Sequence, residues 1–280
     1  MNSENVIFVG GSMRSGTTIL HRVLSTAEGS HPYISEAWFI FELMRTRSSV
    51  LSSYDIKGLD YFGSREAFDT YILNLIESHI GDVARRYHPA SRVFIKHPEL
   101  TRLFGTFGRW FPRSPFVVSI RDPRDTIASM VRVAERQSAR GVTPPPQIRG
   151  RNMRTLCETF LSNYRWMETM PASLAGRVTT VRYEALMTDT AATVADLARA
   201  LEVKIDLDRI AAFGETRERS ANFDPAIRAS DPLLGGFFSE LYNSNLTPSR
   251  IGRHVEVLTQ DEIAEIERRC AAFATRHGYW

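Results

Sequence analysis

The feature that most constrains the fold is a glycine-rich loop near the N-terminus. A short apolar run, Val-Ile-Phe-Val at 6–9, stops at Gly10 and Gly11, and apolar residues with helical spacing follow over 18–24. This pattern predicts a buried strand, a loop and a helix in direct succession. The loop at 11–18, Gly-Ser-Met-Arg-Ser-Gly-Thr-Thr, has the Gly-x4-Gly spacing of a phosphate-binding loop.

The residues of this loop favour a phosphate group but not a nucleoside triphosphate. Thr17 stands where a nucleoside triphosphatase carries a lysine. Backbone N–H groups after Gly16, with the hydroxyls of Ser15, Thr17 and Thr18, can hold a phosphate at a helix N-terminus. Without the lysine, binding of a triphosphate with magnesium has little support. An ordinary strand-to-helix turn with a Ser or Thr cap is the alternative that the spacing leaves open.

Three further segments, 92–95, 116–120 and 178–181, are β-branched or aromatic runs separated by helix-length segments. The order βαβα predicts an α/β fold with a central parallel sheet flanked by helices. A chain of 280 residues suits a single domain over 1–280, with a P-loop-like nucleotide-binding core. At the C-terminal end, Thr259 begins a capping sequence for an amphipathic helix that extends to Ala274.

Two stretches interrupt the helical and strand patterns. Residues 136–155 contain three consecutive prolines and several arginines, and residues 213–246 combine prolines, paired glycines and aromatic side chains. Neither stretch can be helical throughout. We expect both to be mobile loops over the site that binds an acceptor.

Composition and charge limit the partners of the chain. A net charge of +3 is too small to imply nucleic acid by itself. Cys157 and Cys270 have no His or Cys neighbours at metal-ligand spacing, so we predict neither a metal site nor a disulfide framework. The apolar run at the start is shorter than a signal-peptide core, and no segment has the length of a membrane span. We therefore expect a cytoplasmic protein with no bound metal.

The glycine-rich loop also resembles a known binding element. Residues 9–20 are similar to the 5′-phosphosulfate-binding loop of sulfotransferases that use 3′-phosphoadenosine 5′-phosphosulfate (PAPS). The similarity is closest to the tyrosylprotein sulfotransferase branch, whose loop reads Pro-Arg-Ser-Gly-Thr-Thr, although Met13 replaces the proline. The resemblance implies that PAPS is the sulfuryl donor and that 3′-phosphoadenosine 5′-phosphate (PAP) is the product. It also implies that Arg14 contacts the sulfate and phosphate oxygens.

A second element resembles the family's 3′-phosphate-binding segment. Residues 120–129 read Ile-Arg-Asp-Pro-Arg-Asp-Thr-Ile-Ala-Ser. The resemblance implies that Arg121, at a strand end, and Ser129, eight residues later, bind the 3′-phosphate. An arginine side chain suits this role because its guanidinium binds phosphate oxygens in a bidentate manner.

Two later elements complete the resemblance, in the family's order. Residues 181–186 resemble a Tyr-Glu-x-Leu segment, which implies that Tyr183 lies near the nucleotide. Residues 249–254 resemble the last cofactor segment, in which a basic residue meets the 3′-phosphate. Arg250 and Arg253 are both candidates for that contact, and we favour Arg253.

The resemblance further implies in-line sulfuryl transfer to an acceptor hydroxyl without a covalent enzyme intermediate. Lys96 resembles the lysine of a Lys-x-Pro segment at a strand end, and we assign it, with Arg14, to charge stabilisation. Glu36 resembles the glutamate base of the tyrosylprotein branch and could act as a base if desolvation raised its pKa.

His97 is the alternative base. Cytosolic small-molecule sulfotransferases use a histidine after such a lysine, but there one residue intervenes between the two. Adjacent strand residues point to opposite faces, so Lys96 and His97 need not share a site.

The acceptor hydroxyl could belong to a peptide tyrosine, a phenol or an alcohol. Two other functions stay open: a P-loop nucleotide or small-molecule kinase, and a relative that binds a nucleotide without turnover.

Overall fold

The computed structural model describes residues 3–213 and 245–280. The predicted loop at 213–246 therefore lies outside the described residues, except for Phe213, Asn245 and Leu246.

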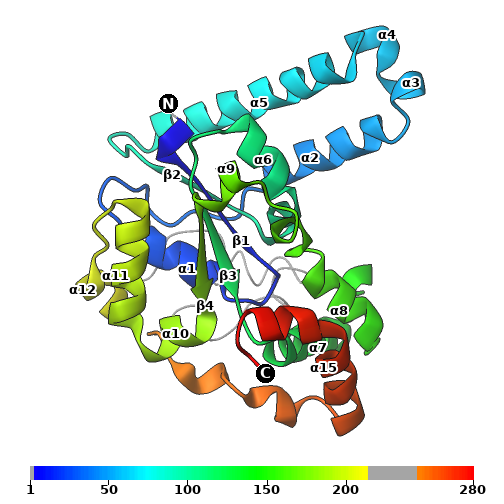
Figure 1. The fold of residues 1–280 in the computed structure, drawn as a ribbon, viewed down its shortest axis with the longest axis vertical. Helices are drawn as coiled ribbons and strands as arrows, with labels where there is room; N and C mark the ends of the chain where they lie inside the picture. The colour runs from blue at the N-terminus through cyan, green and yellow to red at the C-terminus, as the bar shows by residue number, and fades with distance from the viewer. Residues whose placement is uncertain (1–2, 214–244) are drawn as a thin grey trace.

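A parallel sheet of four strands forms the centre of the molecule, in the order β2-β1-β3-β4 (Figure 1). The strands are β1 (Val6–Gly11), β2 (Val93–Lys96), β3 (Phe116–Ile120) and β4 (Val178–Arg182). They coincide with the predicted segments, and the α/β fold with a parallel sheet is confirmed. Val9 pairs with Lys96 and Gly11 pairs with Ser119, so β1, β2 and β3 end at the same edge of the sheet.

Both faces of the sheet are covered, because alternate residues of each strand enter different cores. On one face, Ile7 and Val9 pack with α1 and α11. On the other face, Val6 and Phe8 pack with residues from the remaining large helices. The helices of the first face are α1 (Thr17–Leu24), α10 (Tyr183–Thr188), α11 (Thr190–Leu201) and α12 (Leu207–Ala211). Those of the second are α5 (Arg65–Arg86), α6 (Phe104–Trp110), α7 (Pro123–Ala139), α8 (Met153–Leu161) and α15 (Gln260–Arg276).

A helical arm projects from this body (Figure 1). Helix α2 (Trp38–Leu51) runs outward, α3 (Tyr54–Lys57) and α4 (Leu59–Phe62) form the tip, and α5 returns to the sheet. The sequence patterns above did not predict this arm. Short helices complete the described structure: η1 (Ser3–Asn5), η2 (Pro98–Leu103), η3 (Pro146–Ile148), η4 (Arg165–Met167), α9 (Ala172–Ala175), η6 (Pro248–Arg250) and η7 (Arg253–Glu256).

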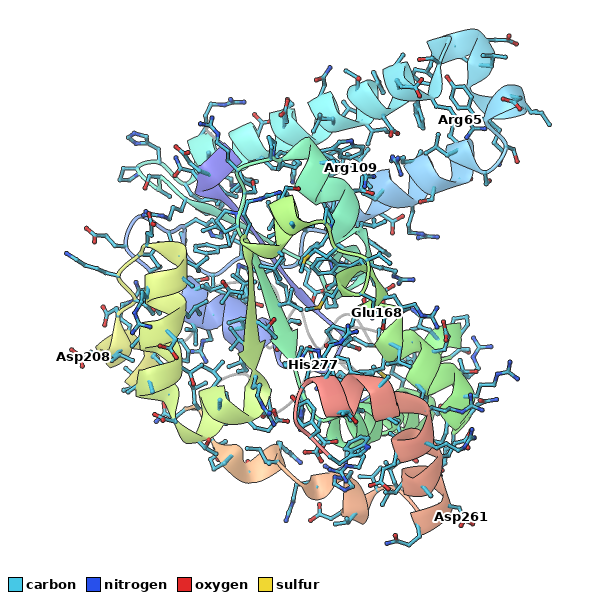
Figure 2. The ribbon with its side chains drawn as sticks, in the orientation of Figure 1. Arg65, Arg109, Glu168, Asp208, Asp261 and His277 are labelled. Carbon is cyan, nitrogen blue, oxygen red and sulfur yellow. The ribbon has the colours of Figure 1, made fainter. Side chains whose placement is uncertain are left out.

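Charged side chains such as Arg65, Asp208 and Asp261 lie at the periphery, away from the sheet (Figure 2). Within residues 3–213 and 245–280, no helix combines the length and apolar character that crossing a membrane requires.

The segment 136–155 consists of the end of α7, a connection that contains η3, and the start of α8. Ile148 is buried in this connection, and Arg151 pairs with Glu135 and Glu262 at 2.9 and 2.6 Å. As predicted, the segment is not helical throughout. Its mobility and its position over an acceptor remain predictions.

Candidate active site

The glycine-rich loop turns sharply between β1 and α1. Gly11 and Gly16 have φ angles of +136° and +96°, and Arg14 between them has a φ of +67°. Residues that carry a side chain rarely adopt positive φ angles, so glycine is favoured at both ends of the loop, positions 11 and 16. A Cβ atom at Gly11 would also lie 2.5 Å from the carbonyl oxygen of Ser119. The loop is therefore fitted closely against the end of β3.

The buried hydroxyl groups of Tyr164 and Thr101 hold the backbone of the loop in place. The Tyr164 hydroxyl accepts a hydrogen bond from the Ser12 N–H at 2.9 Å and donates one to the Ser119 carbonyl at 3.0 Å. The Thr101 hydroxyl accepts a hydrogen bond from the Gly11 N–H at 2.7 Å. These bonds fix the loop conformation by contacts from segments far away in the sequence.

The hydroxyl of Ser15 does not face the site. It donates to the carbonyl of Ser12 at 2.7 Å, and the Ser15 N–H bonds to the same oxygen at 3.1 Å. The Ser119 hydroxyl in turn donates to the Ser15 carbonyl at 2.6 Å. The expectation of a phosphate-binding hydroxyl at Ser15 is therefore not supported by its contacts, because the side chain stabilises the loop. Thr17 and Thr18, in contrast, line a hollow beside the loop.

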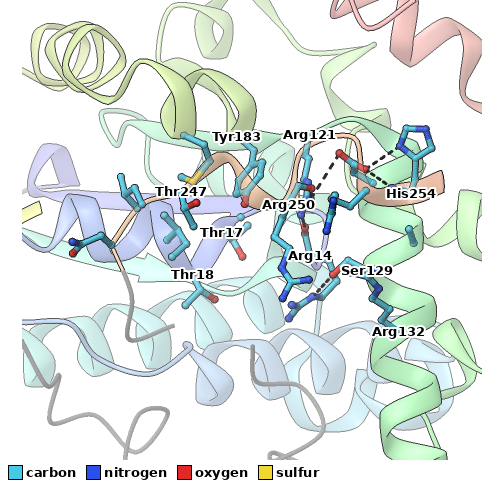
Figure 3. Close-up of a pocket in the computed structure, with 18 of the residues that line it drawn as sticks. Arg14, Thr17, Thr18, Arg121, Ser129, Arg132, Tyr183, Thr247, Arg250 and His254 are labelled. Atoms are coloured by element: carbon cyan, nitrogen blue, oxygen red, sulfur yellow. Dashed lines mark hydrogen bonds and ion pairs between the residues drawn. The ribbon is translucent and has the colours of Figure 1, made fainter. Parts of the chain in front are cut away.

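Arg121 is one of the residues that line this hollow (Figure 3). Its guanidinium donates to the carbonyls of Arg14 and Arg250 at 3.2 and 2.6 Å. It also lies 4.2 Å from the ring centre of Tyr183, a cation–π distance. The Nε atom of Arg121 is buried and has no hydrogen-bond partner among the described residues. A buried guanidinium with an unused N–H group is suited to an anionic ligand.

Arg14 and Ser129 meet on the same wall of the hollow. The Arg14 Nε atom donates to the Ser129 Oγ atom at 3.1 Å, which joins the loop to α7 (Figure 3). The sequence predictions gave these residues to different phosphate groups. The structure brings them into direct contact, so Arg14 lies on the nucleotide side of the site.

The C-terminal segment closes the hollow and is held by Asp125. The buried carboxylate of Asp125 accepts hydrogen bonds from the N–H groups of Gly252 and His254 at 2.7 and 3.0 Å. The His254 ring nitrogen Nδ1 lies 3.0 Å from the same carboxylate. Arg250 and Arg253 are thereby both held at the rim.

The two candidate arginines of this segment differ in their surroundings. Arg253 is 55% exposed and pairs with Glu256 at 2.8 Å. Arg250 is half-buried, and its carbonyl accepts the hydrogen bond from Arg121. Arg250 is therefore joined to Arg121 through its backbone, and the assignment of the 3′-phosphate contact to the side chain of Arg253, with Arg250 as the alternative, stays a prediction.

Beside the hollow, a second cluster contains the candidate base. The buried ammonium group of Lys96 forms an ion pair with the carboxylate of Glu36 and lies 3.3 Å from the Thr18 hydroxyl. The backbone holds this pair together, because the Ala37 N–H donates to the Lys96 carbonyl at 2.8 Å. Thr18 is therefore the point where the cluster and the hollow meet.

The charge of Glu36 is set by its neighbours. Burial acts to raise its pKa, but Lys96, His97 and Arg14 together lower the pKa below its ordinary value. The condition named from the sequence, a pKa raised by desolvation, is therefore not met. Glu36 is an ionised carboxylate at neutral pH, which is the form that can accept a proton.

His97 reaches the same carboxylate from another side. Its Nε2 atom lies 3.8 Å from Glu36 Oε2, and its ring stacks on Phe41 with the ring centres 4.3 Å apart. Burial is the main factor that lowers the pKa of His97, to about 4. In a continuous strand, the side chains of Lys96 and His97 would point to opposite faces of the sheet. Because β2 ends at Lys96, this alternation does not apply, and both side chains face Glu36.

Sequence reasoning missed the residues that support the site. Tyr164 and Thr101 act through contacts that no local pattern indicates. Asp125 stands inside the segment 120–129, but its partners follow more than a hundred residues later. Only the clustering of charged residues in that segment could have drawn attention to Asp125.

Comparison with known proteins agrees with this geometry. A model of the "Sulfotransferase family" matches residues 6–207. A Caenorhabditis briggsae protein named "Putative protein-tyrosine sulfotransferase" is 28% identical over 134 residues. That alignment covers 46% of this chain and 44% of the relative, so the match spans less than half of the relative's length.

Solved structures with the same fold include two sulfotransferase domains. The domain from the curacin biosynthetic pathway has a TM-score of 0.61 at 15% identity, with 96% of this chain and 97% of that chain covered. The domain from the Synechococcus PCC 7002 olefin synthase has a TM-score of 0.56 at 14% identity, with coverages of 94% and 93%. Mouse sulfotransferase SULT7A1, solved with PAP, has a TM-score of 0.53 at 12% identity and coverages of 97% and 85%.

Proposed function

This chain belongs to the sulfotransferase family, and on that premise we propose that it transfers a sulfuryl group from PAPS to an acceptor hydroxyl. The observation that carries the proposal is the junction at Thr18. There, a hollow lined by arginines adjoins a carboxylate that is already ionised and paired with a buried lysine. Sulfuryl transfer needs this combination of anion binding and a proton acceptor.

The residues of the hollow fit a nucleotide with two anionic groups. In our proposal, the backbone after Gly16 and the hydroxyls of Thr17 and Thr18 hold the 5′-phosphosulfate. Arg121, Ser129 and one arginine of the C-terminal segment hold the 3′-phosphate. Arg253 and Arg250 are both candidates for this last role, because both line the hollow.

In the transfer step, Glu36 accepts the proton of the acceptor hydroxyl while the hydroxyl oxygen attacks the sulfur in line. One S–O bond forms to the acceptor, and the S–O bond to the 5′-phosphate breaks, which leaves PAP. Lys96 and Arg14 stabilise the negative charge that develops on the bridging oxygen. No covalent bond to the protein is required.

The nature of the acceptor has support from two observations. The rings of Trp38 and Phe41 lie beside His97 and near Glu36, which suits an aromatic hydroxyl such as a phenol or a peptide tyrosine. The name of the Caenorhabditis briggsae relative points in the same direction. A cytoplasmic location stays a prediction from the sequence.

Calorimetric titration with PAP and PAPS tests the donor. We expect binding that Arg121→Ala and Ser129→Ala each weaken by on the order of tenfold or more. Arg199→Ala is the matched control, since the Arg199 side chain is 75% exposed, pairs with its helix neighbour Asp196 and does not line the hollow. Binding of ATP with magnesium in place of PAP would favour a kinase and contradict the proposal.

Turnover is tested separately with radiolabelled PAPS and three acceptors: 2-naphthol, a tyrosine-containing peptide and an aliphatic alcohol. Transfer that Glu36→Gln abolishes without loss of PAP binding is the expected result. Tight PAP binding without transfer to any acceptor would favour the nucleotide-binding relative without turnover.

A further inference from the structure

The hydrogen bonds of His97 determine which ring nitrogen carries the proton. The Glu99 backbone N–H, which can only donate, donates to His97 Nδ1 at 3.1 Å. Nδ1 must therefore be unprotonated, and in a neutral imidazole the proton is then on Nε2. Burial keeps the ring neutral, because it lowers the pKa of His97 to about 4.

The Nε2 atom is buried and faces the candidate base. It has no hydrogen-bond partner among the described residues, and Glu36 Oε2 lies 3.8 Å away. The other oxygen of the carboxylate, Oε1, is the one that pairs with Lys96. The two oxygens of Glu36 thus have different neighbours, an ammonium group at Oε1 and an imidazole N–H at Oε2.

From this arrangement we infer that His97 is a positioning residue, whose Nε2–H group lies beyond hydrogen-bond distance of Glu36 Oε2 but presents a positive dipole to it and so stabilises the ionised carboxylate. The inference rests on the role of Glu36 as the base in the proposed function. It also excludes His97 itself as the base, since Nδ1 is occupied by a donor and Nε2 already carries a proton.

The surroundings of His97 hold its ring in this orientation. Phe41 stacks on the ring at an interplanar angle of 13°, and Trp38 meets it edge-on at 83° with ring centres 4.7 Å apart. The charged groups that face His97 are Glu36, Lys96 and Arg102, and the charged groups that face Glu36 are Lys96 and Arg14. Loss of the neutral imidazole therefore removes the N–H dipole that faces Oε2 and leaves the two cations in place.

Nuclear magnetic resonance tests the tautomer without any need for an acceptor. In protein labelled with ¹⁵N-histidine, the signals of His97 are assigned with His97→Gln. We expect a neutral ring protonated at Nε2 from pH 5 to pH 8. A ring protonated at Nδ1, or one that titrates with a midpoint near 6.5, would overturn the inference.

The pKa of Glu36 tests the effect of the ring. It is measured in protein labelled with ¹³C at glutamate carboxyl carbons and assigned with Glu36→Gln. His97→Phe keeps a flat ring but removes the donor, and we expect the pKa of Glu36 to rise by about 0.5–1 unit. His97→Gln restores an N–H group and should give a smaller rise. The control is His79→Phe, because the His79 ring contacts Phe39 and is not among the groups that face Glu36.

An unchanged pKa of Glu36 in His97→Phe would refute the positioning role, and if that variant does not fold, the same comparison is made with His97→Ala, which also lacks the N–H donor. The PAP titration of the preceding section is run on each variant. If the wild-type protein does not bind PAP, the result counts against the proposed function but not against the effect of His97 on Glu36. The measured tautomer and the pKa of Glu36 would still decide whether His97 acts on Glu36.

Discussion

The ring of Tyr183 lies directly over Gly16, so that a Cβ atom added to this glycine would come within 2.5 Å of the tyrosine Cδ2 atom. The Tyr183 ring is also within cation–π distance of Arg121. The phosphate loop, the candidate 3′-phosphate residue and the Tyr-Glu-x-Leu segment are thus packed into one unit.

Gly16→Ala should disrupt this unit. The new methyl group displaces the Tyr183 ring, and the φ angle of +96° is strained for alanine. We expect the free energy of unfolding to fall by about 1–3 kcal/mol and PAP affinity to fall on the order of tenfold. Urea unfolding and calorimetry measure the two effects. Gly105→Ala is the control, because Gly105 lies in α6 and an added Cβ has no neighbour within 4 Å.

Tyr164→Phe should loosen the loop without touching the hollow. The substitution removes the hydroxyl that accepts from Ser12 and donates to Ser119, and it leaves both buried backbone groups without that partner. A loss of about 1–3 kcal/mol in unfolding free energy is expected from urea denaturation. Tyr61→Phe, at a position 86% exposed, should change stability little. Equal stability of the two variants would show that the hydrogen bonds of the Tyr164 hydroxyl contribute nothing to the free energy of unfolding.

Asp125→Asn should weaken nucleotide binding although Asp125 is not proposed to touch the nucleotide. An amide NH₂ group would face the N–H groups of Gly252 or His254, where the carboxylate accepts two hydrogen bonds. The segment with Arg250 would then lose its alignment, and PAP affinity should fall by about tenfold. Calorimetry on Asp125→Asn and on Asp55→Asn, a position 84% exposed, makes the comparison. Equal affinities would mean that Arg250 does not depend on Asp125.

The Glu36–Lys96 pair gives a prediction that depends on pH. Since the pKa of Glu36 is lowered in the folded protein, the pair contributes stability above the ordinary glutamate value of about 4.5 and loses it as the pH falls through the folded pKa. The difference in unfolding free energy between the wild type and Glu36→Gln should therefore be largest at pH 7 and shrink below pH 4.5. A difference that grows on acidification would contradict the lowered pKa.

Removal of the charged group of Glu36 should lower the free energy of unfolding more than removal of the charged group of Lys96. Lys96 has a fully buried side chain, whereas that of Glu36 is 25% exposed. Glu36→Ala leaves a buried ammonium group unpaired, which costs about 3 kcal/mol or more. Lys96→Met leaves a carboxylate with access to water and should cost less. Denaturation of the two variants at pH 7 decides the order.

The strands and the long helices of the body could be predicted because their signals are local. The strands β1, β2 and β3 are buried along their whole length and consist mostly of apolar residues, whereas β4 is partly exposed and is indicated by its β-branched residues. Helix α15 starts at a complete capping box with Thr259 and Glu262. The arm was not predicted. The buried residues of α5, Phe68, Ile72, Ile76 and Ile80, follow one another at intervals of four, but no local signal indicates that α2 is their partner.

The site residues were located by motif, but their orientations depend on tertiary contacts. The direction of the Ser15 hydroxyl follows from the position of β3, and the direction of His97 follows from the residue at which β2 ends. The position of the segment with Arg250 and Arg253 depends on a hydrogen bond that spans 129 residues. Sequence spacing contains no information on such contacts.

That hydrogen bond has a consequence for how the protein is made. Because Arg121 meets the carbonyl of Arg250, and Asp125 holds Gly252, one wall of the hollow comes from a segment that the ribosome delivers more than a hundred residues after Arg121. The sheet and the glycine-rich loop consist of residues that emerge earlier. A nascent chain can therefore form its sheet before this wall of the hollow is in place.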